Sequence, residues 1–68
     1  MKNTVRENRE KEGITQGELA EELEVTRQTV NAIEQEKYSP SLELAIEMSK
    51  FFDKPVTEIF YPEDGGID

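Results

Sequence analysis

Residues 15–34, TQGELAEELEVTRQTVNAIE, contain two short helical patterns with an interruption between them at residues 24–26. Thr15 followed three positions later by Glu18 is a capping box, which predicts that a helix starts there. Thr26 is a second N-cap candidate, at the end of the interruption. The sequence therefore predicts two helices that meet at an angle, and not one long helix.

The second of these helices divides into an apolar face and a polar face. Val30 and Ile33 lie on the apolar face, whereas Arg27, Gln28 and Asn31 lie on the other. Two short helices joined by a tight turn form a helix-turn-helix, which leaves the outer face of the second helix exposed. Arginine can bond guanine, and glutamine or asparagine can bond adenine, in the major groove of DNA. The polar face therefore predicts that this helix reads DNA sequence.

Apolar spacing and cap residues predict three further helices. The first runs from its cap to about residue 12, the second covers residues 42–52, and a short third lies within residues 53–60. The N-cap candidates are Asn3 or Thr4 for the first and Ser39 or Ser41 for the second. The longest helix has more apolar residues than one core-facing side holds, so it is either central or covered by a second subunit. We expect an all-α fold, a compact four- to five-helix bundle over residues 1–60, with a polar tail at 61–68.

Composition narrows the class of protein. A chain of 68 residues is one domain of modest stability, which a partner chain would raise. It contains no cysteine and no run of about 18 apolar residues, so we expect a cytoplasmic protein without a membrane span. Histidine is absent too, so the chain lacks the usual general base as well as the usual activated thiol. We therefore expect no enzymatic activity, no cofactor and no metal site.

The charge balance opposes the DNA-reading interpretation. The net charge is −8, and residues 15–38 include two basic and six acidic residues. DNA affinity normally rests on basic residues that displace counterions from phosphates. In molar salt, however, the Debye length falls to about 3 Å, so distant acidic groups are screened while short-range contacts persist. We expect the salt dependence of binding to be unusually flat or even inverted.

Residues 5–60 resemble the phage Cro and repressor type of helix-turn-helix regulator, the XRE-like family. The most specific parts of the resemblance are residues 15–34, the KYSPSLELA segment at 37–45 and the PVTEIF segment at 55–60. The resemblance implies a lambda repressor-like bundle that binds a pseudo-palindromic operator on double-stranded DNA as a homodimer. It also implies a repressor of transcription.

Individual roles follow from the positions that match the family. The implied base contacts are Arg27, Gln28 and Asn31. The implied contacts to the DNA backbone are Thr26, Lys37, Tyr38 and Ser39, and Gln16 would touch a phosphate and also brace the recognition helix. As short donors, Thr26 and Thr29 can also reach phosphates or a thymine methyl. Arg9 and Glu34 match the structural salt bridge of the family, so neither is assigned to DNA. An apolar group near the C-terminus is either core or, at least in part, a dimer interface: Phe51, Phe52, Val56, Ile59, Phe60 and Tyr61.

Some positions depart from the family pattern. Glu24, Glu36 and Asp53 stand where glycine is usual, and each exchange adds an acid. We interpret the exchanges as surface acidification of the kind expected in a halophilic host. If these positions keep a left-handed backbone, each costs roughly 1 kcal/mol. Asn8 replaces an inward leucine, which acidification does not explain.

The main alternative is a protein-interaction module, an antitoxin-like or adaptor helix-turn-helix with little DNA selectivity. Its acidic surface would bind a protein partner of unknown identity. The outer face of the helix after Thr26 discriminates between the two, because only a DNA reader needs that face exposed.

Overall fold

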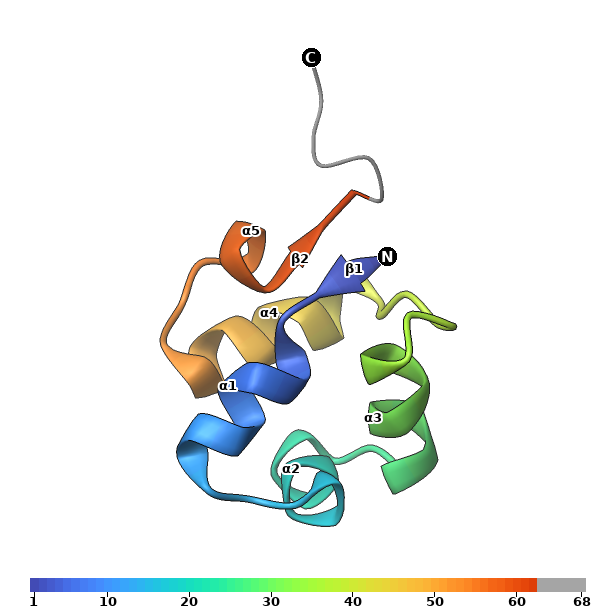
Figure 1. The fold of residues 1–68 in the computed structure, drawn as a ribbon, viewed down its shortest axis with the longest axis vertical. Coiled ribbons are helices and arrows are strands. Elements are labelled where there is room, and N and C mark those ends of the chain that lie inside the picture. Colours follow the sequence, from blue (N-terminus) through green and yellow to red (C-terminus); the bar gives the residue numbers. More distant parts are fainter. Residues whose placement is uncertain (63–68) are drawn as a thin grey trace.

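The computed structural model describes residues 1–62 and contains five helices and two short strands (Figure 1). In chain order these are β1 (Lys2–Asn3), α1 (Val5–Glu12), α2 (Gln16–Leu23), α3 (Arg27–Glu34), α4 (Leu42–Phe52), α5 (Val56–Ile59) and β2 (Phe60–Tyr61). The predicted all-α class is confirmed, and the helices begin and end within a residue or two of the predicted ranges.

The two strands join the ends of the described chain in an antiparallel pair, in which Lys2 lies opposite Tyr61 and Asn3 opposite Phe60. The backbone N–H of Thr4 extends this contact by donating to Ile59 O at 2.9 Å. Tyr61 therefore belongs to the folded domain and not to the polar tail predicted over 61–68. The part of that tail from residue 63 onward lies outside the described residues.

The core draws on all five helices. Six of its side chains are shielded completely from solvent: Val5, Leu19, Val30, Ile33, Met48 and Ile59. Each such side chain stabilises the fold by roughly 1.5–3 kcal/mol.

The apolar group that the sequence assigns either to the core or to a dimer interface divides between buried and partly exposed residues. Phe52, Ile59 and Phe60 are buried in the core of their own chain, because α5 folds back over the end of α4. The Phe52 ring also packs edge to face against that of Phe51, with the centroids 5.2 Å apart. Phe51 and Val56 remain partly exposed beside this core.

The helix starts follow the cap chemistry of the sequence. Thr15 and Glu18 form both bonds of the capping box, at 3.1 and 2.8 Å. Thr26 and Ser41 each accept a backbone N–H at 3.1 Å, so Ser41, and not Ser39, caps α4. At α1 the cap position is Thr4, without a side-chain cap bond.

Three helix or turn ends adopt the left-handed backbone that favours glycine. Glu24, Glu36 and Asp53 have φ values of 59°, 64° and 56°, beside Gly13 at 74°. They are the three positions at which the family pattern has glycine, so the local backbone is kept although the side chain has changed. A left-handed conformation costs an L-residue about 1–2 kcal/mol.

Asn8 is buried, and its side chain is bonded. Its Nδ2 donates to Thr4 O at 2.9 Å and to Thr4 Oγ1 at 3.0 Å. The Thr4 hydroxyl in turn donates to Glu58 O at 3.0 Å. The asparagine thus links α1 to α5 through Thr4 at a position where leucine would only fill space, and a buried polar group that is bonded carries little penalty.

Candidate nucleic-acid interface

The corner between α2 and α3 is built by three consecutive residues. Glu24 ends α2 in its left-handed conformation, and Val25 donates its N–H back to Ala20 O at 3.0 Å while its side chain packs against the core. Thr26 then starts α3 by accepting the N–H of Thr29. As a result α3 runs at an angle to α2 along the edge of the molecule (Figure 1).

The rotation of α3 buries its apolar face and exposes its polar face. Val30 and Ile33 are fully buried, whereas Arg27 and Gln28 are exposed. Within residues 1–62, no side-chain hydrogen bond or ion pair engages either Arg27 or Gln28. Their donors and acceptors are therefore available to a ligand.

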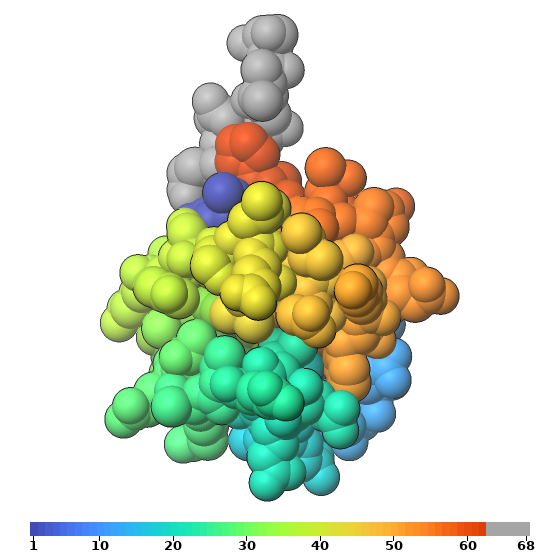
Figure 2. Space-filling view, turned by 180° about the vertical axis from the view of Figure 1, so that it is seen from behind, coloured from blue at the N-terminus to red at the C-terminus, as the bar shows by residue number. Residues whose placement is uncertain are grey.

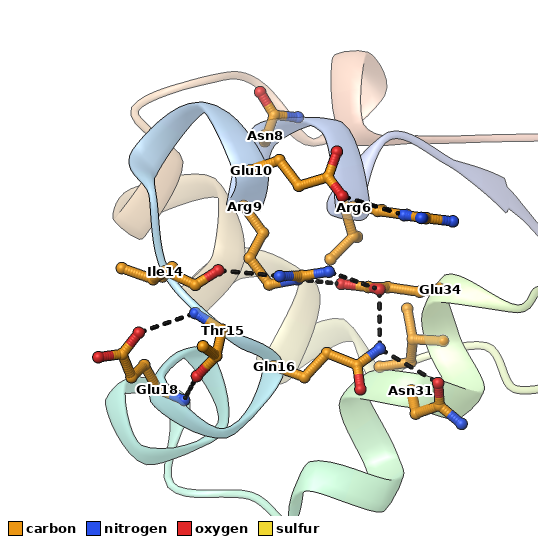
Figure 3. A network of polar contacts seen from close by, with 12 residues as sticks. Arg6, Asn8, Arg9, Glu10, Ile14, Thr15, Gln16, Glu18, Asn31 and Glu34 are labelled. Carbon is orange, nitrogen blue, oxygen red and sulfur yellow. Dashed lines mark hydrogen bonds and ion pairs between the residues drawn. The ribbon is translucent and has the colours of Figure 1, made fainter.

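A polar network fixes α3 against α1 and α2 (Figure 3). Arg9 Nε lies 2.7 Å from Glu34 Oε2, in an ion pair whose side chains are 12% and 4% exposed. Arg9 Nη1 also donates to Ile14 O at 2.8 Å. Gln16 Nε2 donates to Glu34 Oε1 at 2.9 Å and to Asn31 Oδ1 at 3.1 Å. The pairing that the family resemblance implies for Arg9 and Glu34 is thus present in the structure.

The same network defines what Gln16 can do. Its amide nitrogen has two hydrogens, and both are donated within the protein. No donor remains for the phosphate contact that the resemblance implies for this residue. Gln16 is placed to hold α3, which is the other role that the resemblance implies for it.

The ion pair is insensitive to pH on the arginine side. The hydrogen bond to Glu34 raises the pKa of Arg9 above its ordinary value, against the opposing effect of burial. The guanidinium therefore stays charged at every pH that the fold is expected to encounter.

Gln35 belongs to the exposed face, although the sequence did not single it out. It is the C-cap residue of α3, is exposed, and donates from Nε2 to Asn31 Oδ1 at 3.3 Å. Its position, one turn after Asn31 and two turns after Gln28, was a signal that helical periodicity could have supplied.

The remaining predicted contacts flank α3. Thr26, Gln28, Thr29 and Tyr38 surround a shallow hollow with Ala32 at its edge. The two threonine hydroxyls lie 3.0 Å apart, so one hydroxyl hydrogen bonds the pair and the other is left to donate outward. Lys37 and Ser39 are exposed in the loop after α3, next to Tyr38, which is 50% exposed.

An acidic groove adjoins this surface. It opens between the end of α2 and the start of α4, which meet on the face shown in Figure 2. Thr29 and Tyr38 contribute to its wall, and its four carboxylates are Glu22, Glu24, Glu43 and Glu47. The surface that would meet DNA is therefore bordered by negative charge on one side.

Two further kinds of feature are absent from the part of the chain that the structure describes. No helix in residues 1–62 is both long enough and apolar enough to cross a membrane. No group of three or more acidic side chains there is arranged to hold a metal ion.

Two short helices at an angle, the second capped by threonine and exposing a polar face, define the helix-turn-helix class. A family profile described as helix-turn-helix matches residues 5–59. An uncharacterised HTH-type transcriptional regulator of Methanocaldococcus jannaschii is 47% identical over 64 residues, covering 94% of this chain and 97% of its own. A second such regulator, from Bacillus subtilis, is 45% identical with the same coverage. A third, from Methanothermobacter thermautotrophicus, is 42% identical over 67 residues, or 97% of each chain. The chain belongs to the XRE-type helix-turn-helix family of transcriptional regulators.

Proposed function

We propose that this protein is a sequence-specific regulator of transcription that inserts α3 into the major groove of an operator. The observation that carries the proposal is the exposed polar face of α3, on which Arg27 and Gln28 have no partner within residues 1–62. An arginine at such a site matches guanine, and a glutamine matches adenine. Backbone contacts are proposed for Thr26, Thr29, Lys37, Tyr38 and Ser39.

The proposal includes a homodimer. Two copies of α3 about 34 Å apart would read half-sites separated by one helical turn, so the operator would be pseudo-palindromic. The proposed role is repression, which the family resemblance alone supports. Exposed apolar residues on α4, Leu42 at 74% and Ile46 at 40%, support a dimer face on that helix. They are one turn apart on the same side of the helix.

The experiment that tests the proposal is selection from a pool of random duplexes at several potassium chloride concentrations. We expect a single enriched motif with two related halves. Enrichment of no motif at any salt concentration, by a chain shown to be folded, would contradict the proposal.

The acidic groove favours a second candidate function, a module that binds a protein. Its four glutamates lie beside exposed Tyr38, and the net charge of −8 suits a basic partner. The two functions separate on the variant Arg27→Ala with Gln28→Ala. Loss of selective DNA binding by a folded variant supports the regulator, while unchanged capture of a protein together with absent DNA selectivity supports the module.

A further inference from the structure

We infer that Asn31 acts toward DNA as a hydrogen-bond donor only, and that it selects a base with a keto oxygen in the major groove over adenine. This inference rests on the proposed function, since it specifies which base edge one residue of α3 can read. Guanine O6 and thymine O4 are the keto oxygens on offer.

The buried ion pair fixes which atoms of the network donate hydrogen bonds and which accept them. The guanidinium of Arg9 has donors only, and the ionised carboxylate of Glu34 has acceptors only. Glu34 Oε1 lies 2.9 Å from the side-chain amide of Gln16. An acceptor must face a donor, so the Gln16 atom at this distance is the amide nitrogen.

The orientation of the Gln16 amide in turn determines the orientation of the Asn31 amide. The same Gln16 nitrogen lies 3.1 Å from the Asn31 amide, so the Asn31 atom that faces it is the carbonyl oxygen Oδ1. Gln35 Nε2 approaches the same Oδ1 at 3.3 Å. A carbonyl oxygen has two lone pairs, and both are occupied within the protein. Asn31 therefore has no acceptor left for a ligand.

The donor end of the same amide points the other way. Figure 3 shows the nitrogen of Asn31 directed away from Gln16 and from the ion pair. The residue is only half-buried and lies one turn beyond Arg27 and Gln28 on α3. Its two N–H groups are thus the part that a base edge would meet.

This polarity changes the expected base. An asparagine that recognises adenine must accept from the N6 amino group while it donates to N7. With its oxygen occupied, Asn31 can donate to adenine N7 but cannot accept from the N6 amino group, which is left without a partner. Guanine presents acceptors at both O6 and N7, and thymine presents one at O4, so both suit a donor-only amide. Gln16 and Glu34 are positioning residues in this scheme because they act through Asn31.

The test uses duplexes with single-atom changes. The base pair contacted by Asn31 is first identified as the operator position at which Asn31→Ala removes the base preference. We expect the wild-type protein to prefer guanine or thymine there by about three- to tenfold over adenine, the range for one hydrogen bond. With adenine installed, replacement by purine, which lacks only the N6 amino group, should not weaken binding.

Freeing Asn31 Oδ1 from its two protein partners should reverse this base preference. In the double variant Gln16→Met with Gln35→Met, the side chain of Asn31 can rotate and accept a hydrogen bond. The affinity for the duplex with adenine should therefore rise, and replacement of that adenine by purine should lower the affinity about threefold or more. Gln28→Met is the matched control, because Gln28 lies outside the network and should alter a different operator position. Thermal unfolding of each variant checks that the fold is kept.

A measurement without DNA tests the arrangement itself. In the free protein, the side-chain amide hydrogens of Gln16 should exchange with solvent more slowly than those of exposed Gln28. Equal exchange rates would overturn the inference, as would a wild-type preference for adenine or an Asn31→Ala variant with unchanged base preferences. Absence of selective DNA binding by the wild-type protein would contradict the proposed function as well, so the two failures are distinguishable.

Discussion

Glu24 illustrates how a single residue can carry a local cost that the rest of the fold tolerates. It ends α2 with φ at 59° and ψ at 40°, a conformation open to glycine without penalty. We predict that Glu24→Gly raises the free energy of unfolding by about 1 kcal/mol, measured by denaturant titration.

Matched variants separate the backbone from the charge. Glu24→Gln removes the acid and keeps the side chain, so it should gain much less than glycine does. Gly13→Ala is the reciprocal change, since an added Cβ would meet no atom within 4 Å and only the backbone would be strained. Gly13→Ala should lower the free energy of unfolding by about 1 kcal/mol. Equal gains from Glu24→Gly and Glu24→Gln would show that charge, and not backbone, sets the effect.

Residue roles that depend on local chemistry could be predicted from the sequence. Thr15 and Thr26 are caps because their hydroxyls bond backbone groups three residues away. The sequence does not reveal which atoms donate and which accept in the bonds from Gln16 to Glu34 and Asn31, because these bonds depend on the angle at which α2 meets α3. The bonded role of buried Asn8 depends likewise on where α5 lies.

At the scale of elements, the ion pair between α1 and α3 has a natural comparison within α1. Arg9 and Glu34 are nearly buried, whereas Arg6 and Glu10 pair at 3.2 Å with side chains 68% and 56% exposed. We predict that Arg9→Met lowers the free energy of unfolding by about 3 kcal/mol or more, because it leaves a buried carboxylate unpaired. Arg6→Met should lower it by about 0.5 kcal/mol or less.

The pH dependence of this difference has a definite sign. Because the pKa of Arg9 is raised in the folded state, the charged form stabilises the fold at every pH below the ordinary arginine pKa. The arginine contribution is therefore fully present at neutral and mildly alkaline pH and is lost only as the pH rises through the folded-state pKa. Chemical unfolding of both variants at neutral and alkaline pH checks this, and similar losses for Arg6→Met and Arg9→Met would contradict it.

Helix positions could be predicted more reliably than the contacts between helices. Each of the four longer helices, α1 to α4, has its own side-chain cap or left-handed end, and apolar spacing marks its buried side. The pairing of β1 with β2 has no such signal, because two residues per strand are too few to show alternation. The burial of Phe52 could not be predicted from helical spacing either, because it follows from the packing of α5 against α4.

At the scale of the whole molecule, the exposed apolar pair on α4 supports a prediction about assembly. Leu42→Glu with Ile46→Glu should shift the proposed dimer to monomer in sedimentation experiments, because charge would replace apolar contact, while the helical circular dichroism spectrum is kept. Glu47→Lys, a charge change at an exposed position away from the Leu42 and Ile46 stripe of the same helix, is the control and should leave the dimer intact. A double variant that remains dimeric would exclude this face.

The acidic groove leads to a prediction about salt. Its four glutamates lie beside the proposed interface and repel phosphate most at low ionic strength. We expect operator affinity to stay level or rise toward molar potassium chloride, whereas a variant with Glu22, Glu43 and Glu47 changed to glutamine should show a decline. A steep decline for the wild-type protein, like that of an ordinary basic DNA-binding domain, would contradict this prediction.

The most direct test of the central claim compares the affinity of the wild-type chain and the Arg27→Ala, Gln28→Ala variant for the selected operator and for a scrambled duplex. Removal of two good base contacts should cost about 2 kcal/mol or more on the operator and little on the scrambled sequence. The variant should keep its thermal unfolding transition, because both side chains are exposed. Equal operator affinity for wild type and a folded variant would contradict the claim that the outer face of α3 reads DNA.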